Sequence, residues 1–368
     1  MLKRAVWGLA AGLVLAALAG GFTPLTSSGV EAADIVWHGY TLNRIYQPQG
    51  GPTRFRTDRI SLSAAAQIDP KLSAYVEVYY HPFVPAAGPA EPYRIYLESA
   101  YTDIKMNPGT LRVGKGRRMA FAITPSYPNR KTTNYGIFSE AFTQDRAQGI
   151  QYFVDSKHYE AGVAVVTGMR IGNRAIGDVT LDGTNLVKNL ADRDVPHDIN
   201  ETLQIEGKYG LILKNGAKLG ITGAFGHLDQ SDLDFLNAEF KSNTHTSKTH
   251  DRYGVYAVWP SGNYVLQGQY MLAETSDIDH SGWEITAGYQ PKGMKPKFFA
   301  RYAGVDMDVA PTSNQYTWDK RQISLSVVKP LRPSVWLQLE HERNMEDPGC
   351  GAEDVRDDIT LLELFTGF

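Results

Sequence analysis

The segment with the clearest pattern of charge runs from Lys115 to Lys131. It contains no acid and five basic residues: Lys115, Arg117, Arg118, Arg130 and Lys131. Basic side chains gathered at a narrow passage of low dielectric constant attract anions, because little water screens their field. The alternative interpretation is that these side chains form ion pairs with acids elsewhere in the chain and only hold their own segment in place.

Residue patterns that would carry catalysis are missing from the sequence. It contains no Gly-x-Ser-x-Gly, no His-Glu-x-x-His and no glycine loop that could cradle a phosphate, and its nine histidines form no convincing triad pattern. Cys350 is the single cysteine, so neither an internal disulfide nor a cysteine-pair metal site can form. We therefore predict no enzyme, no cofactor and no metal, and expect Cys350 to be an exposed thiol.

A second charged segment, at 228–250, contains acids followed by two histidines. The residues are Asp229, Asp232, Asp234, Glu239, His245 and His250. Alternating carboxylates could suit Ca²⁺, but the full spacing of a calcium-binding loop is absent, so we interpret the segment as a solvated acidic loop. The net charge of −3 argues against nucleic acid as a partner, because such proteins carry a basic surface.

The N-terminus has the three parts of a secretory signal peptide. Lys3 and Arg4 precede an apolar stretch at 5–22, and Val30 and Ala32 stand three residues and one residue before the cleavage site. We predict a signal peptide at 1–32 and a mature chain at 33–368; an uncleaved membrane anchor is the alternative. The mature chain has no apolar stretch long enough for a membrane-spanning helix, so it can cross a membrane only as a closed barrel.

Segments of about ten residues, in which polar and apolar residues alternate, recur along the mature chain. In 283–290, Trp, Ile, Ala and Tyr share one face, and Glu, Thr, Gly and Gln share the other. Period two indicates a β-strand, and this length suits a tilted strand that crosses a bilayer. We predict sixteen strands, at 34–47, 54–68, 72–81, 93–105, 110–116, 145–154, 158–168, 202–213, 217–227, 251–259, 263–273, 282–290, 296–304, 320–329, 334–342 and 358–368.

The connections between these segments alternate between short and long. Every second one is a tight turn built from Pro, Gly, Asn, Asp or Ser, such as Asn107-Pro108-Gly109 and Asn215-Gly216. The others are longer, at 48–53, 82–92, 117–144, 169–201, 228–250, 274–281, 305–319 and 343–357. Short periplasmic turns and long outer loops are typical of outer-membrane barrels. We therefore predict an all-β fold, a transmembrane antiparallel β-barrel in the outer membrane of a Gram-negative-type bacterium.

The chain resembles the sixteen-stranded outer-membrane porins over nearly all of its mature length. Its last segment, 359–368, alternates apolar residues and ends on an aromatic residue, as the assembly signal of such porins does. The resemblance implies that Phe368, Leu364 and Leu362 face lipid and are read by the barrel-assembly machinery. It also implies a homotrimer.

Two shorter pieces resemble the phosphate-selective porin O/P family. They are Leu111-Arg112-Val113-Gly114-Lys115, which leads into the third long loop, and Gln144-Asp145-Arg146-Ala147-Gln148-Gly149, which follows it. In porins of this size the third loop folds into the lumen and narrows it, which implies a constriction loop at about 117–144. Wall residues that could face it are Arg59, Arg94, Glu77, Glu98, Glu206, Lys208 and Arg301.

The function that these patterns favour is passive diffusion of small hydrophilic solutes, with a preference for anions, through a water-filled lumen. Acids on the wall could offset that preference. The main alternative is a barrel that encloses a partner, as in porin–cytochrome electron conduits, where a periplasmic or outer-surface cytochrome would supply the haem. An inward-folded third loop favours the pore, and an unobstructed lumen favours the conduit. A soluble secreted β-protein is a third alternative, which the alternating loops and Phe368 oppose.

Overall fold

The computed structural model describes twelve stretches of the chain. They are 34–81, 94–118, 121, 123, 131–143, 146–168, 170–175, 188–193, 202–240, 244–309, 314–355 and 357–368. The predicted signal peptide and Arg130 lie outside the described residues.

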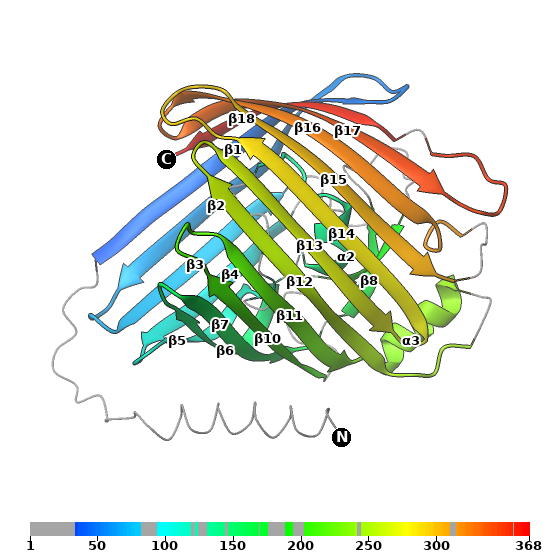
Figure 1. The fold of residues 1–368 in the computed structure, drawn as a ribbon, viewed down its shortest axis with the longest axis horizontal. Helices are drawn as coiled ribbons and strands as arrows, with labels where there is room; N and C mark the ends of the chain where they lie inside the picture. Colours follow the sequence, from blue (N-terminus) through cyan, green and yellow to red (C-terminus); the bar gives the residue numbers. More distant parts are fainter. Residues whose placement is uncertain are drawn as a thin grey trace.

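Sixteen antiparallel strands close into one barrel (Figure 1). Its strands are β1 (Asp34–Pro48), β2 (Arg54–Gln67), β3 (Leu72–His81), β4 (Arg94–Lys105), β5 (Thr110–Arg117), β6 (Arg146–Asp155), β7 (Tyr159–Thr167), β10 (Leu203–Ile212), β11 (Lys218–His227), β12 (Thr249–Ser261), β13 (Tyr264–Thr275), β14 (Ile278–Tyr289), β15 (Lys297–Asp308), β16 (Asp319–Arg332), β17 (Val335–Asp347) and β18 (Ile359–Gly367). Each strand pairs with the next in the chain, except that β7 pairs with β10 and β18 closes onto β1. The predicted fold class and strand number are confirmed.

Alternation along each strand separates an apolar outer face from a polar inner face. In β14, Ile285 is 52% exposed on the outside, whereas its neighbours Glu284 and Thr286 are each 3% exposed on the inside. This pattern suits a wall between lipid and a polar interior, because successive strand side chains point to opposite faces. None of the described helices is long and apolar enough to cross a membrane.

The barrel closes where the last strand meets the first. Residues Tyr40 to Pro48 of β1 pair with Gly367 to Ile359 of β18. The amide of Phe368 donates to the carbonyl of Gly39, and the amide of Gly39 donates to the carbonyl of Phe368, both at 2.9 Å. The terminal residue therefore completes the hydrogen bonding of the seam.

Several strands continue further toward the long loops than the sequence predicts. The loop expected at 274–281 is a two-residue turn, Ser276-Asp277, in which Ser276 adopts the left-handed conformation (φ 58°) that tight hairpins use. The flanking polar residues Glu274 and Asp279 pair within the sheet. The prediction of a long loop was wrong here because strand positions near a bilayer edge can be polar on both faces.

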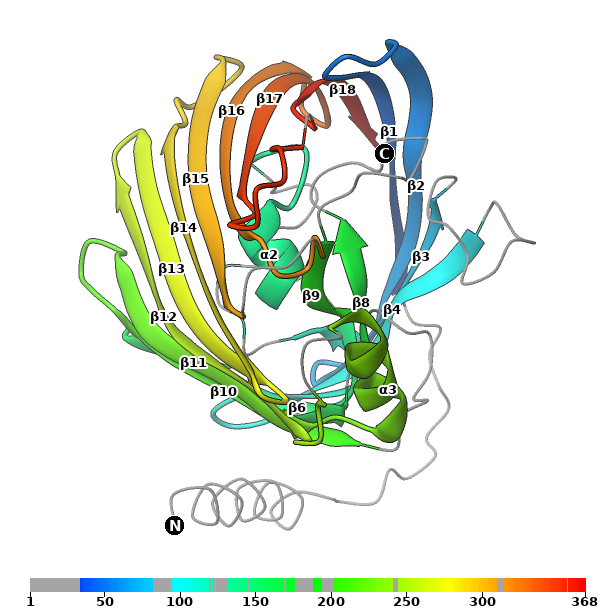
Figure 2. The same cartoon turned by 90° about the vertical axis from the view of Figure 1, so that its right-hand side faces the viewer.

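Three elements inside or across the barrel opening were not predicted. They are the helix α2 (Ile137–Phe142), the hairpin of β8 (Arg170–Ala175) with β9 (Lys188–Arg193), and the helix α3 (Gln230–Glu239). Figure 2 shows α2 and the β8–β9 hairpin within the ring of strands, and α3 at its rim. They belong to the third, fourth and fifth long connections, so the interior is partly filled by loops.

Candidate functional site

The third long loop leaves the wall at β5 and returns at β6, but its middle lies against the other side of the barrel. Helix α2 contacts β14, β15 and β16, which stand seven to nine places from β5 around the sixteen-stranded ring in either direction. The loop therefore crosses the lumen. Residues 131–143 are the described part of the segment, about 117–144, that the resemblance to porins predicts to fold inward.

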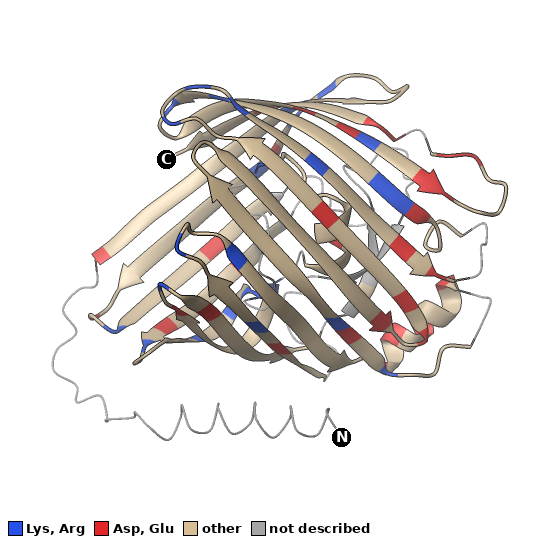
Figure 3. Ribbon diagram, viewed as in Figure 1, with Lys and Arg blue, Asp and Glu red and all other residues tan. Residues whose placement is uncertain are grey.

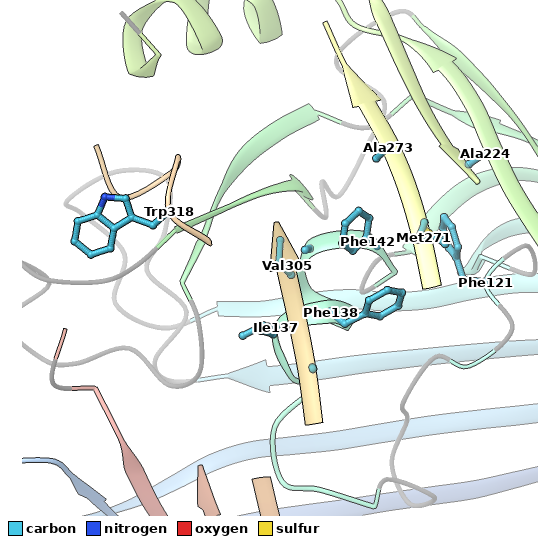
Figure 4. Packing of buried hydrophobic residues seen from close by; sticks show 11 residues of the cluster. Phe121, Ile137, Phe138, Phe142, Ala224, Met271, Ala273, Val305 and Trp318 are labelled. Carbon is cyan, nitrogen blue, oxygen red and sulfur yellow. The ribbon is translucent and has the colours of Figure 1, made fainter. Parts of the chain in front are cut away.

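Apolar residues of α2 form one anchor of this loop. Ile137, Phe138 and Phe142 are at most 1% exposed and pack with residues of the inner wall, among them Met271, Ala273, Ala303 and Val305 (Figure 4). Gly282 of β14 faces the rings, and a Cβ there would lie 2.3 Å from Cε2 of Phe142. A glycine at this wall position is thus what admits the aromatic ring.

Polar groups just before α2 form the second anchor. The Arg301 guanidinium donates to the Asn134 carbonyl (3.1 Å) and to a carboxylate oxygen of Glu342 (2.9 Å). The Asn134 amide donates to the other Glu342 oxygen (2.7 Å), and the amide of Thr133 donates to Glu340. A Cβ on Gly136 (φ 85°) would lie 2.5 Å from Cζ of Arg301, so the backbone passes directly over the guanidinium.

Arg44 links the same loop tip to the seam of the barrel. Its guanidinium donates to the Thr133 carbonyl (2.9 Å) and to Glu363 of β18 (2.8 Å), and it lies 3.2 Å from Asp58. The loop residues 132–134 are therefore held by side chains from β15, β17 and β1, and Glu363 of β18 fixes Arg44. Buried charges of this kind persist only when paired and hydrogen-bonded.

The predicted constriction residues are mostly buried against partners. Arg118 pairs with Glu206 (3.0 Å), and Glu98 pairs with Arg146. The ammonium of Lys115 donates to the Leu97 carbonyl (2.9 Å), and that of Lys131 donates to Gln267. Burial lowers the pKa of Lys131, and the nearby Glu284 acts in the opposite direction. Of these contacts, that of Arg118 with Glu206 is an ion pair, whereas Lys115 and Lys131 donate to neutral oxygens.

The remaining predicted wall residues have varied positions. The Arg59 guanidinium lies over the Tyr79 ring, 4.8 Å from its centre. Lys208 lies 3.6 Å from Glu160, and Glu77 accepts from Ser61 (2.8 Å). Arg117 ends β5 and is partly buried. Arg94 begins β4, but its side chain lies outside the described residues.

The sequence analysis missed Arg44, Glu340, Glu342 and Glu363, which hold the loop tip. A signal was present, because Gln338, Glu340, Glu342 and Asn344 occupy every second position of β17 and are all buried. The sequence alone shows that these four residues form a polar face of the strand. The sequence does not indicate which loop lies on it.

Helix α3 forms a lid at the long-loop end. Leu233, Leu236 and Phe240 cluster with Ile171 of β8 and with Met307 and Tyr316. Asp232 accepts from the Ile171 amide (2.8 Å) and forms a capping box with Asp229 at the start of the helix. Residues 230–239 of the segment that was expected to be a solvated acidic loop, 228–250, thus form a helix, and two of its acids cap it.

The residues predicted as an assembly signal lie on the outer face of β18. Leu364 and Phe368 are 36% and 68% exposed, and Leu362 is partly exposed. Cys350 is an exposed free thiol in the connection after β17. Within the described residues no three metal-ligating side chains come together.

Searches against family models and curated proteins gave no match. Among solved structures, the barrel is similar to OmpF of Salmonella typhi in complex with daunomycin, with a TM-score of 0.62, 13% identity and coverage of 91% of this chain and 97% of that one. It is also similar to a loop-deletion mutant of OmpT, an outer-membrane protein of Vibrio cholerae (TM-score 0.59, 12% identity, 92% and 100% covered). A third similar structure is an anion-selective porin from Comamonas acidovorans, with a TM-score of 0.55, 16% identity and coverage of 92% of this chain and 100% of that one.

These likenesses extend over almost the whole chain, but the identities are low, so they establish the fold. The chain has the architecture of bacterial outer-membrane porins, with an apolar outer face suited to a membrane. The predicted fold, an outer-membrane type of antiparallel barrel, is therefore confirmed.

Proposed function

We propose that this protein is a porin that lets small hydrophilic solutes diffuse across the bacterial outer membrane. The observation that carries this proposal is the third loop, which crosses the lumen and is fixed to the opposite wall through Arg301, Glu340 and Glu342. A loop that is fixed across the lumen would narrow the passage that solutes take. Selectivity then comes from width and lining charge, and no chemical step is needed.

The preference for anions is a finer part of this proposal. Pairing of Arg118 with Glu206 and of Arg146 with Glu98 cancels charge locally, so the preference would depend on basic groups such as Lys131, whose ammonium donates to the neutral amide oxygen of Gln267. The short motifs that resemble phosphate-selective porins support an oxyanion as the solute, and an anion-selective porin shares the fold. We expect the preference to be mild, because Glu284 and Glu340 also line the interior.

Single-channel conductance in a planar bilayer tests both the porin function and the preference for anions. A salt gradient should give steady channels whose reversal potential has the sign for anions. A matched Arg118→Gln/Glu206→Gln variant, which removes one charge of each sign, should leave that potential nearly unchanged. The absence of any channel in correctly folded protein would refute the porin proposal, whereas cation selectivity would refute only the role of the basic residues.

The alternative of a sheath around a cytochrome is less well supported. Such a sheath needs an unobstructed lumen, whereas α2 packs against β14–β16 inside the barrel and the β8–β9 hairpin contacts α2. Co-purification of a haem protein with the native barrel, combined with absence of channels, would reverse this preference.

We also propose that the chain forms a homotrimer through the outer face of β1, β2 and β18. Thr57 donates to Asn43 there (2.9 Å), between the exposed Ile45 and Ile60, and a polar pair facing hydrocarbon is costly. A second copy would cover it. A Vibrio cholerae OmpT structure of the same fold is described as a trimer. Mass measurement in detergent should give three copies, and a monomer alone would contradict this arrangement.

For assembly, we propose that the terminal strand is the recognition segment, with Phe368, Leu364 and Leu362 presented on its outer face. Deleting Phe368 should reduce insertion into the outer membrane, because it removes the last two hydrogen bonds of the seam and the terminal aromatic. Replacing Thr366 on the same face by Val is the control, which should insert normally. Normal insertion of the deletion variant would contradict the proposal.

A further inference from the structure

The tight-turn end of the barrel has an exposed basic rim. Among the described residues, the exposed basic side chains at this end are Lys71, Lys105, Lys157, Lys214, Lys292, Lys295, Lys329 and Arg332. The exposed acids there are Asp34, Asp69 and Asp155. These basic residues come from six of the seven tight turns or the strand ends beside them, so they surround the opening rather than forming one patch.

The long-loop end has the opposite charge. Its exposed acids, within the described residues, are Asp234, Glu274, Asp277, Asp279, Asp308, Asp347, Glu353 and Asp354, against Lys248 and Arg343 as exposed basic residues. Figure 3 shows the acids gathered at the end that carries α3, and basic residues at short turns of the other end. The exposed charges of the described residues are therefore separated along the barrel axis.

Charged rims change the local concentration of mobile ions within a Debye length. An acidic opening enriches cations and repels anions, and a basic opening does the reverse. We propose that the two mouths have opposite ion preferences and that the channel consequently rectifies, passing more current when the long-loop side is positive. This inference rests on the proposed porin function and adds the residues that set ion access at each mouth.

The direction of rectification follows from which mouth each ion enters. With the long-loop side positive, cations enter through the acidic mouth and anions enter through the basic mouth, so both accumulate in the lumen. With the voltage reversed, each ion must enter through the mouth that repels it, and the lumen is depleted. The effect should grow as salt falls, since the Debye length increases from about 3 Å at 1 M to about 30 Å at 0.01 M.

The chain provides its own marker of orientation. Cys350 is exposed in the connection between β17 and β18, at the long-loop end, and is the only cysteine. A membrane-impermeant maleimide polymer added to one chamber should change the current only when this end faces that chamber. Cys350→Ser is the control and should not respond from either side.

The experiment compares single-channel currents at equal and opposite voltages in the full-length mature protein. We expect a current ratio near one in 1 M salt and about twofold in 0.01 M salt, with the larger current when the labelled end is positive. Lys71→Gln/Lys157→Gln/Lys214→Gln/Lys292→Gln should lower the ratio and shift the reversal potential toward cations. Glu274→Gln/Asp277→Asn/Asp279→Asn/Asp347→Asn should also lower the ratio but shift the potential toward anions.

The two variants distinguish a separated charge from a uniformly selective pore, because only separation makes both lower the ratio with opposite shifts in potential. Equal currents in 0.01 M salt, the reverse polarity, or a ratio that neither variant changes would overturn the inference while leaving the porin proposal intact. Absence of channels in folded protein would instead refute the porin proposal.

Discussion

The third loop and the α3 lid both extend from the barrel wall over its interior, but they are held by different forces. The third loop combines an apolar cluster around Phe138 and Phe142 with a charged network around Arg301. The lid depends on an apolar cluster around Leu236, with Asp232 as its main charged contact. Buried charge needs partners at fixed positions, whereas apolar packing is not directional. We therefore expect the third loop to keep one fixed position, and the α3 lid to cover the barrel opening with less restriction on its exact position.

Breaking the charged network of the third loop should have the largest effect. Arg301→Met leaves Glu342 buried without its guanidinium partner, which costs about 3–5 kcal/mol for a fully buried pair, and it frees the Asn134 carbonyl. We expect the folded barrel to unfold at a lower temperature, as measured by the change in its gel mobility after heating. We also expect a larger single-channel conductance with more current noise.

The double variant Arg301→Met/Glu342→Gln is the matched control for that substitution. Removing both charges should recover part of the stability, since no unpaired ion remains. Equal losses in the single and double variants would show that the charge pair is not what holds the loop.

Weakening the apolar anchor should have a smaller effect. Phe142→Ala removes a ring that is 1% exposed, a change that costs about 3 kcal/mol in a closed core and less here if lumen water fills the space. Gly282→Ala acts from the wall side, because its Cβ would collide with the same ring. Both substitutions should raise the noise of the single-channel current without changing the reversal potential. A shift in that potential would contradict the view that the apolar anchor only holds the loop and does not set ion selectivity.

Features that depend on residues close together in the sequence could be predicted from it, whereas the contacts that hold the third loop could not. The alternation in segments such as 283–290 depends only on neighbours along the chain, so it predicted the strands, their number and the faces of β18. The tight turns were equally local. The third loop was located by resemblance, but its anchors pair residues that are far apart in sequence, such as Thr133 with Glu340.

The basic stretch from Lys115 to Lys131 shows the corresponding limit. Its composition indicated a role in attracting anions, yet Arg118 lies against Glu206 and Lys131 beside Gln267. Composition gives the sign of a charge but not its partner. Likewise, the acids at 229 and 232 suggested a solvated loop because capping is visible only once a helix is assumed.

The lid should be easier to loosen than the third loop. Asp232→Ala removes both the capping box of α3 and the acceptor of the Ile171 amide, a loss of about 1–2 kcal/mol. We expect faster amide hydrogen exchange in both α3 and β8. Asp229→Ala, which removes only the cap, should affect α3 alone, and identical exchange in the two variants would argue against a link between Asp232 and β8.

The smallest expected effect concerns the connection after β17. Burial, together with the nearby Asp358 and Asp354, raises the pKa of Asp357 to about 7. A carboxyl whose pKa is higher in the folded state binds more protons there, so its stabilising contribution is complete below the ordinary pKa of 3.8 and is lost progressively as pH rises from there through about 7. Asp357→Asn should therefore raise the melting temperature more at pH 8 than at pH 5, and leave it unchanged at pH 3. Glu353→Gln, an exposed neighbour, should change the melting temperature at none of these pH values. A gain at pH 5 equal to that at pH 8 would mean that the effect of the asparagine is not due to titration.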